Sequence, residues 1–150
     1  MPELNLLIAG DGPEKKRLKR LTGDSSNIKL MGFVPDEELP YYYQNCLAYL
    51  ICNEEDFGIS PVEAMSFGKP VLALRRGGAM ETILENKTGE FFDELKLDVF
   101  TESIRAMNNK IKNNYYNPEV LKKHSERFSH ERFKKELLDI IKSLGYNFKS

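Results

Sequence analysis

Short apolar runs, separated by glycine, proline and charged residues, fill the first part of the chain. The runs that have the length of strands are residues 4–9, 27–31, 47–52, 70–74 and 90–92. The intervening segments that read as helices are residues 14–18, 35–44, 60–68 and 79–83. Strands that alternate with short helices predict an α/β fold. We therefore expect a Rossmann-like parallel sheet with helices on both faces.

The pattern changes near residue 97 and is helical from there on. Apolar residues recur at helical spacing in the last stretch, at Phe133, Leu137, Ile140, Ile141 and Leu144. We expect one domain over residues 1–150. It divides at most into an α/β core, 1–96, and C-terminal helices, 97–150.

Composition narrows the classes of function. The chain has 150 residues, of which 41% are hydrophobic and 30% charged, and its formal net charge is -1. Bulk charge therefore gives no reason to expect a nucleic-acid partner. The start, Met1-Pro2-Glu3-Leu4, lacks a basic segment, and no apolar run approaches the roughly 20 residues of a membrane span. We expect a cytoplasmic protein.

The two cysteines agree with that compartment. Cys46 and Cys52 flank the expected strand 47–52. At the rise of an extended strand they lie about 20 Å apart, beyond the reach of a disulfide. Two reduced, structural thiols are therefore expected.

Two glutamates, Glu55 and Glu63, carry the most informative chemistry. Glu55 follows the strand 47–52, and Glu63 lies on the first turn of the next expected helix. Ligands of open α/β sheets bind at the carboxyl ends of the strands. Carboxylates accept hydrogen bonds, and free amides at a helix start attract anions. The pair is suited to sugar hydroxyls beside a phosphate.

Each glutamate also has a structural interpretation. Ser60 and Glu63 have the spacing of a capping box, with Pro61 at the first helical position. Glu55 stands between Glu54 and Asp56, and three consecutive acids are often a solvated loop. The local sequence leaves both interpretations open.

The segment from Glu55 to Glu63 resembles the E-x7-E signature of retaining GT-B glycosyltransferases of the family 4 type. Other landmarks of that family's C-terminal half follow in the right order: Gly10-Asp11-Gly12-Pro13, residues 28–32, Gly77-Gly78, Thr88-Gly89 and Arg127-Phe128-Ser129. The resemblance covers most of the chain. It implies one half of a GT-B fold that binds a nucleotide diphosphate sugar. It also implies transfer of a hexosyl group to a hydroxyl acceptor with retention, without a metal or other cofactor.

The resemblance assigns roles to particular residues. Glu55 would meet the hexose hydroxyls and Glu63 the ribose. The donor-binding set would be the amides of Phe57, Gly58 and Ile59, the base-facing Phe33 and Val34, and the glycines Gly10 and Gly12. Phe33 and Val34 are equally suited to packing at a strand end. Gly10 and Gly12 are equally suited to a tight turn.

The chain also departs from the family. The first strand and helix of that half, with an Arg and a Lys for the diphosphate, are missing, and Arg75 and Arg76 do not match their positions. The N-terminal acceptor-binding domain is missing too. We therefore expect weak donor binding and a need for an N-terminal domain or partner chain. The acceptor would be a sugar or a lipid-linked sugar. The alternatives are a non-catalytic nucleotide-sugar binding module, half of a split enzyme, or a degenerate fragment.

The remaining features carry less weight. His124 and His130 lack clustered ligands, so surface or capping positions are expected rather than a metal site. Residues 41–43, three tyrosines, suggest core packing more than base stacking. The basic segment 15–20 is typical of a solvated helix face, with peripheral contact to the cytoplasmic face of a membrane as a lesser alternative.

Overall fold

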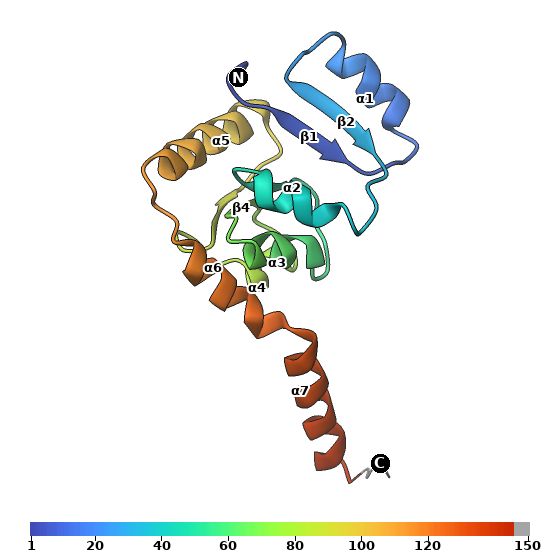
Figure 1. Ribbon diagram of the computed structural model, residues 1–150, viewed down its shortest axis with the longest axis vertical. Helices are drawn as coiled ribbons and strands as arrows, with labels where there is room; N and C mark the ends of the chain where they lie inside the picture. The colour runs from blue at the N-terminus through green and yellow to red at the C-terminus, as the bar shows by residue number, and fades with distance from the viewer. Residues whose placement is uncertain (146–150) are drawn as a thin grey trace. The chain divides into compact units, whose positions relative to one another are not determined.

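The computed structural model describes residues 1–145, and its contacts divide the chain into two compact units (Figure 1). Unit 1 ends at Tyr42 and unit 2 begins at Tyr43. Each unit is built of parallel strands and helices, which confirms the expected α/β class. The expected single sheet is instead resolved as two parallel sheets, one in each unit.

Unit 1 is a βαβ arrangement. Its elements are β1 (Leu6–Ala9), α1 (Lys15–Thr22) and β2 (Ile28–Gly32). The two strands pair in parallel, with Leu6 opposite Ile28, and the register shifts between Ile8 and Ala9. Helix α1 has no buried residue, so this unit carries little core of its own. The next helix, α2 (Leu39–Asn45), spans the boundary between the units.

Unit 2 holds a three-stranded parallel sheet and most of the helices. Its sheet consists of β3 (Tyr49–Ile51), β4 (Val71–Leu74) and β5 (Gly89–Phe92), in the order β3-β4-β5. The helices are α3 (Ile59–Ser66), α4 (Ala79–Thr82), α5 (Leu97–Lys112), α6 (Pro118–Ser125), the 3-10 turn η1 (Glu126–Phe128) and α7 (His130–Ser143).

The central strand β4 explains how this sheet is covered on both faces. All four of its residues are buried. Leu72 and Leu74 form a core cluster with Phe92 of β5 and Met107 of α5. Because successive strand residues point to opposite faces, the other residues of β4 face away from α5. Helix α3 packs against β3 and β4, and its Met65 is fully buried, so α3 covers that second face.

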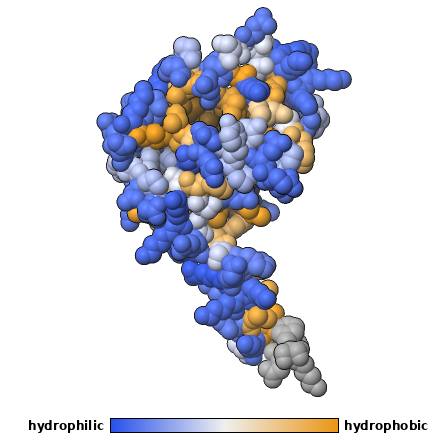
Figure 2. All heavy atoms as spheres, viewed as in Figure 1, coloured by the Kyte–Doolittle hydropathy of each residue, from blue (hydrophilic) through white to orange (hydrophobic). Residues whose placement is uncertain are grey.

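The C-terminal helix α7 forms where the apolar spacing predicted it, but its apolar residues are exposed. Phe133 is 63% exposed and Ile140 58% exposed. Figure 2 shows orange side chains gathered on the C-terminal part of this helix. No residue of α7 is buried among the described residues, so α7 adds nothing to the buried core.

The ends of the elements differ from the sequence prediction by a few residues. Helix α2 begins at Leu39 rather than Pro35, because residues 36–38 form a turn. Helix α1 begins at Lys15 rather than at residue 14, since Glu14 is the N-cap. Cys46 and Cys52 are both free thiols.

Candidate functional site

The loop between β3 and α3 places Glu55 beside the start of α3. The side-chain amide of Asn53 donates to Glu55 Oε1 over 2.9 Å. The other oxygen, Oε2, lies 3.0 Å from the point that a Cβ atom at residue 58 would occupy. Residue 58 is glycine, with φ +78°, a conformation that side chains disfavour. Gly58 therefore lets the Glu55 carboxylate approach the helix start.

Three backbone amides are free at this helix start. The N–H groups of Phe57, Gly58 and Ile59 have no acceptor anywhere in residues 1–145. The first amides of a helix have no partner within it, and the helix dipole adds positive potential there. Amides in this arrangement can bind an anion such as a phosphate, or the oxygens of a sugar.

The capping-box interpretation of Glu63 is wrong. The N-cap of α3 is Gly58, with no side-chain cap, so Ser60 lies inside the first turn. The helix starts earlier than expected because Gly58 adopts a positive φ that other residues rarely adopt. Glu63 Oε2 instead accepts a hydrogen bond from the Tyr43 hydroxyl over 2.9 Å. Glu63 is therefore not committed to capping its own helix.

Tyr43 is the partner that sequence reasoning missed. Its side chain is 8% exposed, whereas Tyr41 is 66% exposed, so the core interpretation holds for Tyr43. Burial raises the pKa of the Tyr43 hydroxyl, and its hydrogen bond to Glu63 raises it further. Burial also raises the pKa of Tyr49, with smaller contributions from the charges of Glu55 and Glu63. The charges of Glu55 and Glu63 thus both raise the pKa of the Tyr49 hydroxyl.

Gly77 and Gly78 do more than turn the chain after β4. The Gly78 amide donates to the Glu55 carbonyl over 2.8 Å. A Cβ at Gly77 would lie 2.4 Å from the Glu55 carbonyl oxygen, and one at Gly78 would lie 2.4 Å from that of Asp56. These glycines therefore let two loops touch through their backbones, which fixes the loop that carries Glu55.

A second group of contacts reaches the same loop from the C-terminal helices. The ring of Phe57 packs edge-on against Phe128, with centroids 5.8 Å apart, and Phe128 packs against His124. His124 is 6% exposed, and its Nε2 lies 2.8 Å from the Thr82 carbonyl oxygen. The expectation of a surface position for His124 is therefore wrong, whereas its contact with the last carbonyl of α4 (Ala79–Thr82) fits the capping alternative. Its partner lies 42 residues away, which no local pattern reveals.

The other predicted donor-binding residues lie in unit 1, at the carboxyl ends of β1 and β2. Gly10 and Gly12 line a hollow that also includes Gly32. Gly10 has φ +119°, and a Cβ at Gly10 or Gly12 would meet no atom within 4 Å. Phe33 is 76% exposed, so strand-end packing does not explain it, and Val34 is half-buried.

A lysine also lies at this hollow, and sequence reasoning gave it no role. The Lys15 ammonium pairs with Asp11 at 2.5 Å and stands 3.5 Å from the Cβ position of Gly32. The hydrogen bond from Lys15 lowers the pKa of Asp11, and the amide of Gly12 lowers it further. Asp11 thus partly neutralises the lysine that lines this hollow.

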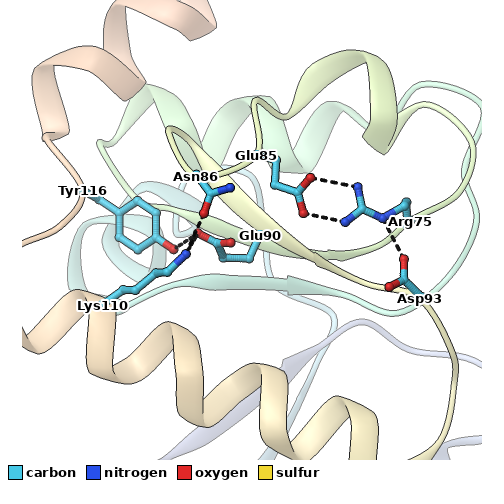
Figure 3. Close-up of polar contacts among 7 residues, drawn as sticks. All are labelled: Arg75, Glu85, Asn86, Glu90, Asp93, Lys110 and Tyr116. Carbon is cyan, nitrogen blue, oxygen red and sulfur yellow. Dashed lines mark hydrogen bonds and ion pairs between the residues drawn. The ribbon is translucent and has the colours of Figure 1, made fainter.

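Arg75 is held by carboxylates, as Figure 3 shows. Its guanidinium donates to both oxygens of Glu85 and to Asp93, and it lies over the ring of Phe91. A guanidinium with two carboxylate partners is poorly placed to hold a phosphate as well. That Arg75 takes no part in binding the diphosphate stays a prediction, and its contacts with Glu85 and Asp93 support it.

We predict that Arg75→Met lowers the free energy of unfolding at neutral pH by about 1 kcal/mol, because the pairs are partly exposed. Arg75 lowers the pKa of Glu85. The stabilisation is therefore present above the unfolded carboxyl pKa and is lost as the pH falls through the folded value. Urea unfolding at pH 7 and pH 3 measures this difference. Arg76→Met is the matched control, since the Arg76 side chain is exposed and makes no hydrogen bond or ion pair within residues 1–145. Equal effects of the two variants would contradict the prediction.

Residues 1–145 contain no cluster of three or more His, Cys, Asp or Glu side chains arranged to hold a metal ion. Each helix within residues 1–145 is too short or too polar to span a bilayer.

Comparison with known proteins identifies the family. The sequence model described as "Glycosyl transferases group 1" matches residues 1–127. The chain belongs to this glycosyltransferase family. It is similar to the GDP-mannose-dependent alpha-(1-6)-phosphatidylinositol monomannoside mannosyltransferase of Mycolicibacterium smegmatis, with 31% identity over 115 residues. That match covers 69% of this chain and 30% of the mannosyltransferase, so the chain spans about a third of the length of its relative.

Solved structures of other glycosyltransferases share the fold. A glycosyltransferase from Rickettsia africae superposes with a TM-score of 0.80 at 21% identity, covering 97% of this chain and 41% of that one. The Anabaena protein HepE in complex with UDP-glucose superposes with a TM-score of 0.74 at 24% identity, covering 95% and 42%. These neighbours show that the glycosyltransferase chain has one half of a GT-B fold.

Proposed function

We propose that this glycosyltransferase chain binds a nucleotide diphosphate sugar around the start of α3. The observation that carries the proposal is the set of free amides at Phe57, Gly58 and Ile59 beside two carboxylates. The amides suit the anionic diphosphate or sugar oxygens, and Glu55 and Glu63 suit hydroxyls. A group 1 relative is named as GDP-mannose-dependent, and the HepE neighbour holds UDP-glucose, which supports a donor of this class.

The reaction that follows is transfer of a hexosyl group to a hydroxyl acceptor with retention of configuration. Glu55 would hold the hexose hydroxyls, and Glu63 the ribose. Charge that develops on the leaving diphosphate is stabilised in part by the free amides at Phe57, Gly58 and Ile59. The acceptor, a sugar or a lipid-linked sugar, would be bound by an N-terminal half or a partner chain.

We predict weak donor binding by this chain alone, with a dissociation constant on the order of 1 mM, equivalent to about −4 kcal/mol. The reason is that Arg75 is held by Glu85 and Asp93, so the amides must carry much of the diphosphate charge. The measurement is titration of ¹⁵N-labelled protein with a panel of nucleotide diphosphate sugars. Concentration-dependent shifts are expected at the amides of residues 57–59.

The control in this experiment is the free sugar without its nucleotide, which should shift these amides much less. Shifts that are absent from residues 57–59 for every nucleotide sugar, with the spectrum of a folded protein, would overturn the donor-site proposal. Shifts at residues 10, 12, 33 and 34 would show that unit 1 also responds to the nucleotide sugar.

A second candidate function is one half of a split glycosyltransferase. A donor-hydrolysis and transfer assay, with and without a candidate N-terminal chain, separates a split enzyme from a non-catalytic binding module. Activity that appears only when both chains are present supports the split enzyme, whereas donor binding without activity in either case supports a binding module.

A further inference from the structure

One oxygen of Glu63 is already engaged by a buried tyrosine. The Tyr43 hydroxyl donates to Oε2 over 2.9 Å, from a helix 20 residues earlier in the chain. Within residues 1–145, no hydrogen bond reaches the second oxygen, Oε1, and Glu63 as a whole is half-buried. The carboxylate therefore has one occupied and one open acceptor.

The Tyr43 ring is fixed on several sides. It stacks on Phe67, with centroids 5.6 Å apart and planes 19° apart, and it packs against Tyr49 at 6.0 Å. Because burial raises the pKa of Tyr43, the hydroxyl keeps its proton and remains a donor at neutral pH. A rigid donor of this kind restricts the rotation of the flexible Glu63 side chain.

We propose that Tyr43 is a positioning residue that holds Glu63 so that its open oxygen meets a ribose hydroxyl of the nucleotide sugar. This inference rests on the proposed donor site. An ionised carboxylate has room for several donors, so both hydrogen bonds can form at once. A carboxylate that is held before the ligand arrives loses less rotational freedom on binding, which strengthens the complex.

The test removes the hydroxyl and keeps the ring. In Tyr43→Phe the stacking on Phe67 and Tyr49 is preserved, while the hydrogen bond to Glu63 is lost. The ligands are the nucleotide sugar that binds best to the wild-type protein and its 2′-deoxy and 3′-deoxy analogues. We expect Tyr43→Phe to weaken binding of the parent donor roughly five-fold. For the analogue that lacks the hydroxyl met by Glu63, Tyr43→Phe and the wild-type protein should bind with equal affinity.

The matched control is Tyr42→Phe, which removes a hydroxyl from the same helix without touching Glu63. It should bind the parent donor as the wild-type protein does. An equal loss of affinity for the parent and both analogues in Tyr43→Phe would mean a merely structural role and would overturn this inference alone. If the wild-type protein binds no nucleotide sugar, the proposed donor site fails and this inference fails with it. Unchanged affinity in Tyr43→Phe also overturns it.

Discussion

Replacement of Gly78 by alanine should lower the free energy of unfolding by about 3 kcal/mol and displace the loop that carries Glu55. The backbone of Gly78, with φ −62°, is compatible with alanine, so the effect must come from crowding. The added Cβ would lie 2.4 Å from the carbonyl oxygen of Asp56 and 2.5 Å from the Cα of Phe57. Both are backbone atoms, which cannot rotate away, and overpacking of this kind is costly.

The displacement should reach the functional groups. The Gly78 amide donates to the Glu55 carbonyl, and the Gly78 carbonyl accepts from the buried Thr82 hydroxyl. A displacement of residue 78 therefore moves both Glu55 and Thr82. We expect altered amide shifts at residues 55–59 and loss of donor binding. Urea unfolding and ¹⁵N spectra measure the two effects.

Gly12→Ala is the matched control for stability. Gly12 has an ordinary φ, and a Cβ there would meet nothing within 4 Å. Its free energy of unfolding should therefore stay within about 0.5 kcal/mol of the wild-type value. If Gly78→Ala is as stable as Gly12→Ala and keeps the wild-type shifts at residues 55–59, the close packing of the two loops is not needed to hold Glu55.

The sequence was most informative where structure depends on local pattern. The apolar run 70–74 gave the buried strand β4, and the alternation of strands and helices gave the α/β class. The spacing of Glu55 and Glu63 placed them on the loop and helix that follow β3. In each case the relevant residues are neighbours along the chain, so periodicity alone indicates the element.

The features that the sequence did not predict are mostly contacts between residues that are distant along the chain. The hydroxyl that engages Glu63 comes from Tyr43, and the buried partner of His124 is Thr82, 42 residues away. No local pattern reports such pairs. The start of α3 was missed for a different reason: a local sequence fits a cap at Ser60, but the positive φ of Gly58 lets the helix begin at Ile59. The division of the strands between two sheets likewise depends on which strands pair, and strand partners are distant along the chain.

Replacement of Glu63 by glutamine should weaken donor binding about 10- to 100-fold and change stability little. The side-chain amide of glutamine keeps one acceptor oxygen, which can still receive the Tyr43 hydroxyl, so the free energy of unfolding should change by less than about 1 kcal/mol. The open position is then an NH₂ group, a donor that cannot accept from a ribose hydroxyl. The lost hydrogen bond involves a charged acceptor and is worth about 1.5–3 kcal/mol.

Glu63→Ala should lower both donor binding and stability, in contrast to Glu63→Gln. It removes both acceptors and leaves the Tyr43 hydroxyl, on a side chain 8% exposed, without its carboxylate partner. We expect the same loss of donor binding as in the glutamine variant, plus a decrease in the free energy of unfolding of about 1 kcal/mol. Calorimetric titration with the best nucleotide sugar and urea unfolding measure the two quantities. Wild-type affinity in Glu63→Gln, with only Glu63→Ala destabilised, would make Glu63 a structural partner of Tyr43 and not a ligand of the donor.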